Sequence, residues 1–186
     1  MLKKILQKDE KVLRKISKEV LVADIKTPKI KKILNEMSNA LDSQDDGVAI
    51  AAPQIGYSLR IFLVSGKIFE KEFMQDSNKK ISNKKPINDT IRLEKKNKDI
   101  VFINPKISKL SREKEWLPEG CLSVRPLYGK TYRSKKATVT AYNEQSKKFT
   151  RGASGLLAQI FQHETDHLDG ILFIDHAKDI REEGIV

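Results

Sequence analysis

The run His163-Glu164-Thr165-Asp166-His167 places two imidazoles four residues apart with a carboxylate between them. On a helix, residues with this spacing lie on one face about 6 Å apart, so both imidazoles can reach a single metal ion. Glu164 then projects close enough to contact a water molecule at that ion. The spacing also arises by chance, but the chain has only three histidines. His176, the third, is assigned mainly to structure.

Two histidines leave a hydrolytic metal ion short of ligands, since such sites usually combine three protein ligands with a water molecule. Further candidates follow the helix motif, namely Asp175, His176, Glu182 and Glu183. The better candidate precedes it, because the segment Glu119-Gly120-Cys121-Leu122-Ser123 carries the only cysteine of the chain in a glycine-containing turn. A lone cysteine is ordinarily a small apolar residue. Taken with the helix motif, a thiolate ligand at Cys121 is favoured.

A third segment, 47–56 (GVAIAAPQIG), is rich in small residues. Small residues let a backbone approach another chain or a ligand closely. Within this segment Gln54 offers an amide donor that could hold a developing oxyanion. A loop of this composition more often reflects tight packing, so the segment carries weight only in combination with the other two.

Hydrophobic periodicity predicts the elements that must position these residues. We expect an amphipathic helix from Pro28 that ends before Asp45, and a helix over 155–168 with Ser154 as its cap and Gly170 as its stop. On the second helix Leu156 and Ile160 share a face with His163, which would set a metal ion against the apolar core. Strands are predicted over 60–64, over 100–103 with an end at Asn104-Pro105, and over 137–142 with a turn at 143–146.

Because these strands come mainly before the last long helix, the pattern favours an α+β fold. We expect a single domain over 1–186, with antiparallel or mixed strands around a central helix that carries the His-Glu-x-x-His motif. A Lys-rich loop insertion is predicted at about 65–99, and the last residues are expected to form a strand or stay extended.

A net charge of +11, from 36 Lys+Arg against 25 Asp+Glu, raises the question of nucleic-acid binding. The basic residues are spread along the chain, and the composition of the densest segment, 79–98, indicates a solvated loop or a hairpin insertion. No recognition helix, zinc finger or aromatic RNA-binding signature accompanies it. We expect no sequence-specific nucleic-acid binding, and at most a weak electrostatic association with a polyanionic surface such as the ribosome.

The single cysteine excludes an intramolecular disulfide and favours a reducing, cytoplasmic location. The apolar stretches are far shorter than the ~20 residues that a membrane helix needs, and we expect no targeting segment at the amino-terminal end. The sequence therefore predicts a protein with no membrane association.

Together and in this order, the three segments resemble the peptide deformylases, which remove the formyl group from the initiator methionine of nascent proteins. The family patterns are G-x-G-x-A-A-x-Q, E-G-C-x-S and Q-H-E-x-D-H. They match Gly47 to Gln54, Glu119 to Ser123 and Gln162 to His167, and the first departs from its pattern at Ala49. Early apolar residues, Ile5-Leu6 and Val12-Leu13-Arg14, are similar to the family's amino-terminal segment, so the resemblance covers most of the chain.

The resemblance implies a metal-dependent hydrolase that releases formate from N-formylmethionyl nascent peptides. Cys121, His163 and His167 would bind one divalent ion, with water as the fourth ligand of a tetrahedron. Fe(II) is the metal that the resemblance implies, and Zn, Ni or Co could occupy the same ligands. Glu164 would act as general base.

The remaining roles concern the substrate. By resemblance, Gln54 and the backbone N–H of Leu122 would stabilise the developing oxyanion. The backbone of Gly47, Val48, Ala49 and Ile50 would lie along the peptide, and Ile160 would help to form the methionine pocket.

Two other functions fit the same residues. One is a different His-Glu-x-x-His hydrolase, such as a peptidase. The other is an inactive, basic ribosome-binding paralogue that retains the motifs as relics.

Overall fold

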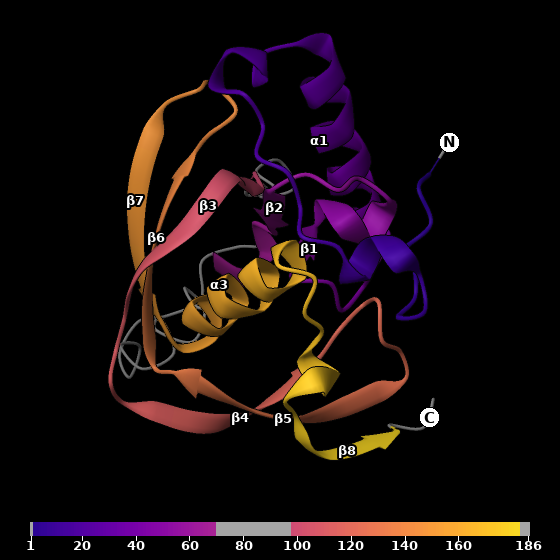
Figure 1. The fold of residues 1–186 in the computed structure, drawn as a ribbon, viewed down its shortest axis with the longest axis vertical. Helices are drawn as coiled ribbons and strands as arrows, with labels where there is room; N and C mark the ends of the chain where they lie inside the picture. Colours follow the sequence, from indigo (N-terminus) through magenta and orange to yellow (C-terminus); the bar gives the residue numbers. More distant parts are fainter. Residues whose placement is uncertain (1, 70–97, 183–186) are drawn as a thin grey trace, which may run out of the picture.

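The computed structural model describes residues 2–69 and 98–182, which form an α+β fold with two antiparallel sheets (Figure 1). The predicted α+β class with antiparallel strands is therefore confirmed. The larger sheet has the order β1-β2-β3-β6-β7 and the smaller has the order β4-β5-β8. The strands are β1 (Ala49–Ala51), β2 (Ile61–Val64), β3 (Ile100–Leu110), β4 (Lys114–Gly120), β5 (Leu127–Ser134), β6 (Lys136–Tyr142), β7 (Lys148–Ser154) and β8 (Lys178–Glu182). The helical elements are α1 (Pro28–Asp42), α3 (Gly155–Leu168) and the short 3-10 turns η1 (Lys11–Arg14), η2 (Val22–Asp24), η3 (Ala52–Ile55) and η4 (Phe173–Asp175).

Helix α1 begins where the sequence predicts it. Thr27 is its N-cap residue, and its hydroxyl accepts a bond from the N–H of Ile30 at 3.5 Å, while Pro28 occupies the first turn. The apolar stripe is buried, as the helical spacing indicates. It consists of Ile30, Ile33, Leu34, Met37, Ala40 and Leu41.

The first strands of the larger sheet lie between α1 and α3 (Figure 1). Successive side chains of a strand point to opposite faces, and here both faces are covered by a helix. The side chains that pack with α1 are Ile50, Ile61, Leu63, Val101 and Ile103. Those that pack with α3 are Ala49, Ala51, Phe62, Val64 and Phe102. This two-sided burial is why the predicted strands appear in the sequence as continuous apolar runs.

Strand β3 corrects one prediction, because it continues through Asn104-Pro105 to Leu110 instead of ending there. Asn104 adopts a positive φ of 50°, and the pairing register with β6 shifts between Ile103 and Lys106. Proline fits at such a bulge, since the ladder requires no N–H from it there. The Asn104 side chain holds the irregular backbone by bonding the N–H of Val20 at 2.8 Å and its carbonyl at 2.7 Å.

Helix α3 has the predicted bounds, but two details of its start differ from the prediction. Ser154 is the N-cap residue, yet its side chain makes no capping bond. Leu156 is 45% exposed, so the apolar backing of the helix comes from residues such as Ile160 and Phe161. The Phe161 ring meets the ring of Phe102 edge-on, with 5.2 Å between centroids. This contact fixes α3 against the larger sheet.

The smaller sheet lies on the other side of α3, along the lower edge of Figure 1. Its last strand, β8, pairs antiparallel with β5, so the predicted strand-forming end of the chain is confirmed as far as Glu182. The predicted turn at 143–146 is also present, with Asn143 Oδ1 accepting bonds from the N–H groups of Gln145 and Lys147. Among the described residues, no helix has the length and apolar character needed to cross a membrane.

The Lys-rich insertion predicted at about 65–99 falls largely on residues 70–97, which lie outside the described residues. The described residues on either side of this segment lie close together. The Gly66 N–H donates to Asp99 Oδ1 at 3.3 Å, and the Ser38 hydroxyl donates to Asp99 Oδ2 at 2.7 Å. Asp99 thus links both sides of the segment to α1.

The turn after α3 allows a prediction about stability. Gly170 has a φ of +77°, and a Cβ placed there would lie 2.8 Å from the carbonyl carbon of Arg14 in η1. Gly170→Ala should lower the free energy of unfolding by about 2–4 kcal/mol, since left-handed strain and a backbone clash add together. Urea denaturation measures this change.

Gly152→Ala is the matched control, because a Cβ at Gly152 in β7 would meet only Thr138 Oγ1, at 3.7 Å. This variant should change the unfolding free energy by less than about 1 kcal/mol. Equal effects of the two substitutions would contradict the proposed contact between the turn and η1.

Candidate metal centre

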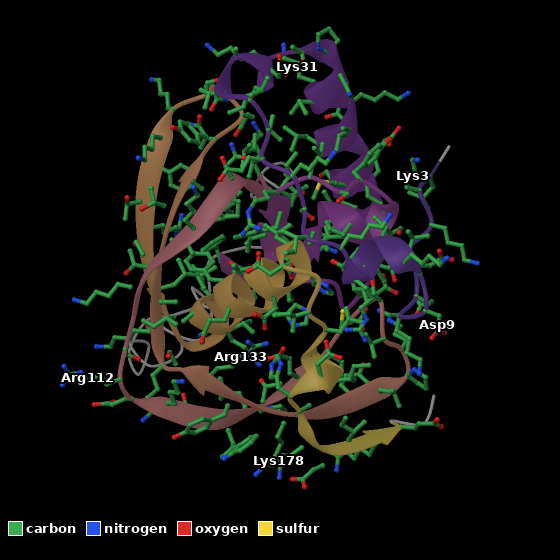
Figure 2. All side chains as sticks on the ribbon, in the orientation of Figure 1. Lys3, Asp9, Lys31, Arg112, Arg133 and Lys178 are labelled. Carbon is green, nitrogen blue, oxygen red and sulfur yellow. The ribbon has the colours of Figure 1, made fainter. Side chains whose placement is uncertain are left out.

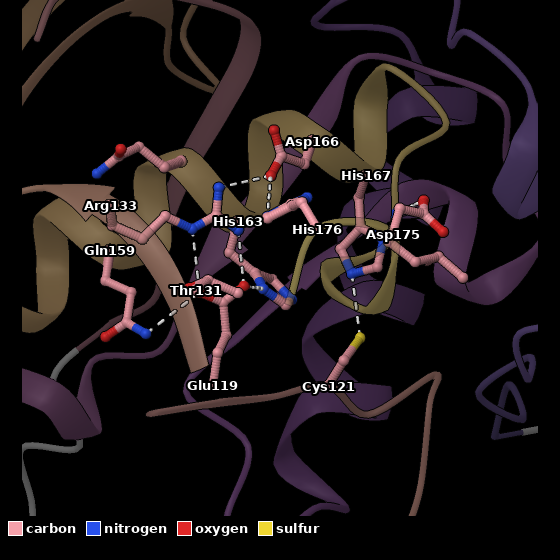
Figure 3. A network of polar contacts seen from close by, with 12 residues as sticks. Glu119, Cys121, Thr131, Arg133, Gln159, His163, Asp166, His167, Asp175 and His176 are labelled. Atoms are coloured by element: carbon pink, nitrogen blue, oxygen red, sulfur yellow. Dashed lines mark hydrogen bonds and ion pairs between the residues drawn. The ribbon is translucent and has the colours of Figure 1, made fainter. Parts of the chain in front are cut away.

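Cys121, His163 and His167 lie together between the smaller sheet and α3. One ligand atom from each lies within 4.8 Å of the other two. Cys121 follows the last residue of β4, and its Sγ lies 3.2 Å from Nε2 of His167 (Figure 3). The two imidazole rings project from one face of α3, with 4.8 Å between centroids. The helical spacing therefore does bring both rings to one place.

Glu119 fixes the orientation of His163. Its Oε1 lies 2.7 Å from Nδ1 of His163, which leaves Nε2 as the ligand atom of that ring. Strand alternation places this carboxylate on the face of β4 that meets α3, two residues before Cys121. Glu119 is only 6% exposed, and Thr131 donates a further bond to its Oε2 at 2.6 Å.

Arg133 on β5 neutralises Glu119 and connects it to α3 (Figure 3). Its Nη2 and Nε donate to the two oxygens of Glu119 at 2.7 and 3.1 Å. Its Nη1 donates to Asp166 Oδ2 at 2.6 Å. A buried guanidinium bonded through several nitrogens holds its partners in a fixed orientation. His176 lies at the edge of this network, with its Nε2 3.9 Å from Asp166 Oδ2.

Burial and these contacts shift the pKa values of the site in opposite directions. Burial raises the pKa of Glu119, but hydrogen bonds from His163 and Arg133 lower this pKa by more than burial raises it, so Glu119 is ionised. Burial lowers the pKa of His163, but contacts with Cys121 and Glu119 raise it well above its ordinary value. Burial and the nearby His163 lower the pKa of His167.

Glu164 lies beside these groups without a hydrogen-bonding partner for its Oε2 among the described residues. Burial raises the pKa of Glu164 to about 7. A carboxylate that is buried without a partner is costly unless a bound group satisfies it.

Gln54 extends toward the same cluster from η3. Its Oε1 accepts a bond from the N–H of Ala51 at 2.8 Å, which fixes the amide plane. Its Nε2 donates to Ser123 Oγ at 3.0 Å and lies 3.6 Å from Cys121 Sγ. The amide donor is therefore oriented in advance and directed at the cysteine.

A cleft of about 300 Å³ opens over the cluster and contains most of the residues that the sequence predicts for the substrate. Its lining includes Gly47, Val48, Ala49, Gln54, Cys121, Leu122, Ile160, His163 and Glu164. Ile50 is placed differently, because its fully buried side chain packs with α1. The carbonyl of Leu122 accepts a bond from Gln7 Nε2 at 3.1 Å.

Strand β1 forms the edge of the larger sheet beside this cleft. The N–H of Ser65 donates to the carbonyl of Val48 at 2.8 Å, so Val48 turns its backbone polar groups toward the end of β2. In an antiparallel pair these directions alternate, which turns the groups of Ile50 toward β2 and those of Ala49 toward the open edge. The methyl group of Ala49 packs with the core under α3.

The sequence reasoning did not identify the roles of Arg133, Thr131 and Ser123. One signal for Arg133 exists in the sequence, since it lies two residues after Thr131 and therefore on the same, buried face of β5. A charged residue on a buried face requires a partner. Which partner it finds depends on the pairing of β4 with β5 and their packing on α3.

The residues present fit a divalent transition metal ion. A thiolate and two imidazoles form a donor set that suits zinc and similar metals, with one coordination position open. The ring nitrogen of His163 that would not face the ion is held by Glu119, which Arg133 holds in turn. The unpartnered oxygen of Glu164 beside the cluster is the further observation that fits a bound ion with a water molecule.

Comparisons with known proteins agree on one family. A family model described as polypeptide deformylase matches residues 2–183. "Peptide deformylase 2" of Clostridium acetobutylicum is 38% identical over 174 residues, which cover 94% of each chain.

Solved structures give the same result. A peptide deformylase from Legionella pneumophila superposes with a TM-score of 0.74 at 32% identity, covering 96% of this chain and 88% of the other. One from Synechococcus elongatus, in complex with actinonin, has a TM-score of 0.70 at 27% identity, covering 94% and 78%.

The buried network predicts a large effect of removing Arg133. Arg133→Met leaves Glu119 buried without its cation, which should lower the free energy of unfolding by about 3–5 kcal/mol. Lys106→Met is the control, since Lys106 forms an ion pair with Glu19 in which both side chains are more than half exposed. Its effect should stay below about 1 kcal/mol. Urea denaturation measures both changes. If Arg133→Met lowers the free energy of unfolding as little as Lys106→Met does, the network does not stabilise the fold.

Proposed function

The chain belongs to the polypeptide deformylase family and is a deformylase, and on that premise we propose how its residues remove the N-formyl group from the initiator methionine of nascent polypeptides. The reaction adds water to a formamide, breaks the C–N bond, and releases formate and a free amino terminus. The observation that carries the proposal is the meeting of Cys121, His163 and His167 beside a cleft that Cys121, His163, Glu164 and Gln54 line.

We assign the metal to Cys121, His163 and His167, with Fe(II) as the native ion and Zn, Ni or Co as ions that the same ligands accept. When bound, the ion supplies Lewis acidity, which lowers the pKa of a water molecule toward ~7 and polarises the formyl oxygen. Glu119 supports this assignment by holding Nδ1 of His163.

Glu164 acts as general base and then as general acid. It takes a proton from the attacking water and delivers it to the amine nitrogen as the C–N bond breaks. Its place supports this role, since it lines the cleft and its Oε2 has no competing partner among the described residues. Cys121 is a ligand in this scheme and does not attack the substrate.

Gln54 and the backbone N–H of Leu122 stabilise the negative charge that develops on the formyl oxygen. The bonds from Ala51 and to Ser123 support this role for Gln54, because they orient the amide before the substrate arrives. A donor fixed in advance needs no reorganisation during the reaction.

The peptide lies along the edge of β1, over Gly47 and Val48, and bonds the backbone groups of Ala49, which the pairing register turns outward. Ile50 contributes by packing against α1, which holds this edge in place. Ile160 lines the cleft and forms part of the methionine pocket.

We extend the proposal to the cellular setting. The substrates are N-formylmethionyl nascent peptides, the location is the cytoplasm, and the surplus positive charge gives a weak association with the ribosome. The whole chain, 1–186, acts as one catalytic domain in which residues of about 65–99 form an insertion.

The assay that tests this function compares a formyl-methionyl peptide with the same peptide without its formyl group. Protein purified without oxygen and assayed for metal should release formate from the first and leave the second intact. Cleavage of an internal amide instead would identify a peptidase. A protein without stoichiometric metal and without turnover would be an inactive paralogue that retains the motifs.

The role of Glu164 gives a separate prediction. Glu164→Gln removes the base but no ligand, so metal content should stay stoichiometric while kcat falls by about 100- to 10,000-fold. Glu113→Gln serves as the control, because that carboxylate is 81% exposed beyond β3 and should leave kcat unchanged. Substantial turnover by Glu164→Gln would show that another group moves the proton.

A further inference from the structure

The outer face of the smaller sheet carries an exposed aromatic pair. Trp116 on β4 and Tyr132 on β5 are direct partners in the strand register, with 5.2 Å between ring centroids. They remain 44% and 52% exposed. Rings of this size ordinarily contribute their large apolar surface to a core or an interface.

Strand alternation gives this sheet two different faces. Glu119, Thr131 and Arg133 point toward α3 and hold the metal centre, whereas Trp116, Tyr132 and Lys130 point away from it. The cleft contains none of the three outward side chains. The cleft reaches this face only further along the same two strands, at Pro118 and Tyr128, so the aromatic pair lies outside the catalytic site.

Lysines surround the two rings. Lys178 on β8 holds its Nζ 4.9 Å from the Trp116 ring centroid, and Lys114 holds its Nζ 5.8 Å from that of Tyr132. Lys130 is 57% exposed and contacts Asp179 at 3.0 Å. Cation–π contacts and ion pairs at exposed positions are both weak, so these ammonium groups can turn to a stronger counter-charge.

A purely structural role explains only part of this arrangement. Cross-strand aromatic pairs stabilise hairpins, which accounts for the contact between Trp116 and Tyr132. It does not account for the exposure of both rings within a group of three lysines. Aromatic faces beside mobile cations are the combination that binds unpaired nucleotides, because bases stack on the rings and phosphates pair with the cations.

We propose that this face, made of Lys114, Trp116, Lys130, Tyr132 and Lys178, binds single-stranded RNA without sequence preference. Charge complementarity and exposed ring faces favour this occupant over an apolar protein surface. The choice of RNA rests on the proposed function, since nascent peptides emerge from a ribosome whose surface exposes RNA. Because none of these five side chains lines the cleft, RNA and peptide can be bound at the same time.

The chain contains one tryptophan, so its fluorescence reports on this face alone. We would titrate the full chain with an oligouridylate of about ten nucleotides. Saturable quenching of Trp116 is expected, and affinity should fall about 20-fold between ~50 and ~200 mM salt if three lysines meet phosphates. An abasic strand with the same phosphates should bind more weakly and leave Trp116 unquenched.

Two variants test the ring and the charge separately. Tyr132→Leu should weaken the oligouridylate by at least about fivefold. Lys178→Gln should reduce the salt slope by about 0.7. Lys31→Gln changes the net charge equally at the opposite end of the molecule and should change neither quantity (Figure 2).

The proposal is overturned if the oligouridylate and the abasic strand act alike, if neither quenches Trp116, or if Lys31→Gln and Lys178→Gln have equal effects. Turnover of a free formyl-methionyl peptide is measured on the same preparations and should be equal in wild type, Lys178→Gln and Lys31→Gln. Loss of turnover with intact RNA binding would refute the proposed function alone. Intact turnover without quenching would refute the RNA-binding face alone.

Discussion

The guanidinium of Arg133 lies buried between two carboxylates, and the orientation of His163 depends on it. Arg133 neutralises Glu119, and Glu119 can therefore remain ionised against Nδ1 of His163. Either charge alone would be costly to bury, and each is stable because the other completes its hydrogen bonds. The partners come from β4, β5 and α3, so one polar cluster both orients a ligand and fixes the smaller sheet against the helix.

The larger sheet supports the site by a different physical effect. Its first strands bury apolar side chains on both faces, against α1 on one side and α3 on the other. This packing holds α3 on one side while the charged network holds it on the other. The edge strand β1 and the turn η3 follow from the same packing, and they bring Gln54 to the cysteine.

The sequence predicted the elements whose patterns are local. The helices at Pro28–Asp42 and Gly155–Leu168 have clear periodicity and were placed correctly. The strand end predicted at Asn104-Pro105 was wrong, because a side-chain contact with Val20 supports a bulge there. Strands β4 and β5 were not predicted, since charged residues on their inner face hide the usual alternation of apolar and polar residues.

The sequence by itself determined that His163 and His167 can share one ion, because spacing along a helix fixes their relation whatever the rest of the chain does. It also supplied Cys121 and Gln54 as candidates. Only the tertiary structure decided that these residues meet, that Glu119 and Arg133 stand behind His163, and that Trp116 and Tyr132 share the opposite face. Those contacts depend on strand register and on the packing of a sheet against a helix. Both bring together residues that are far apart in the chain, so neither leaves a local pattern in the sequence.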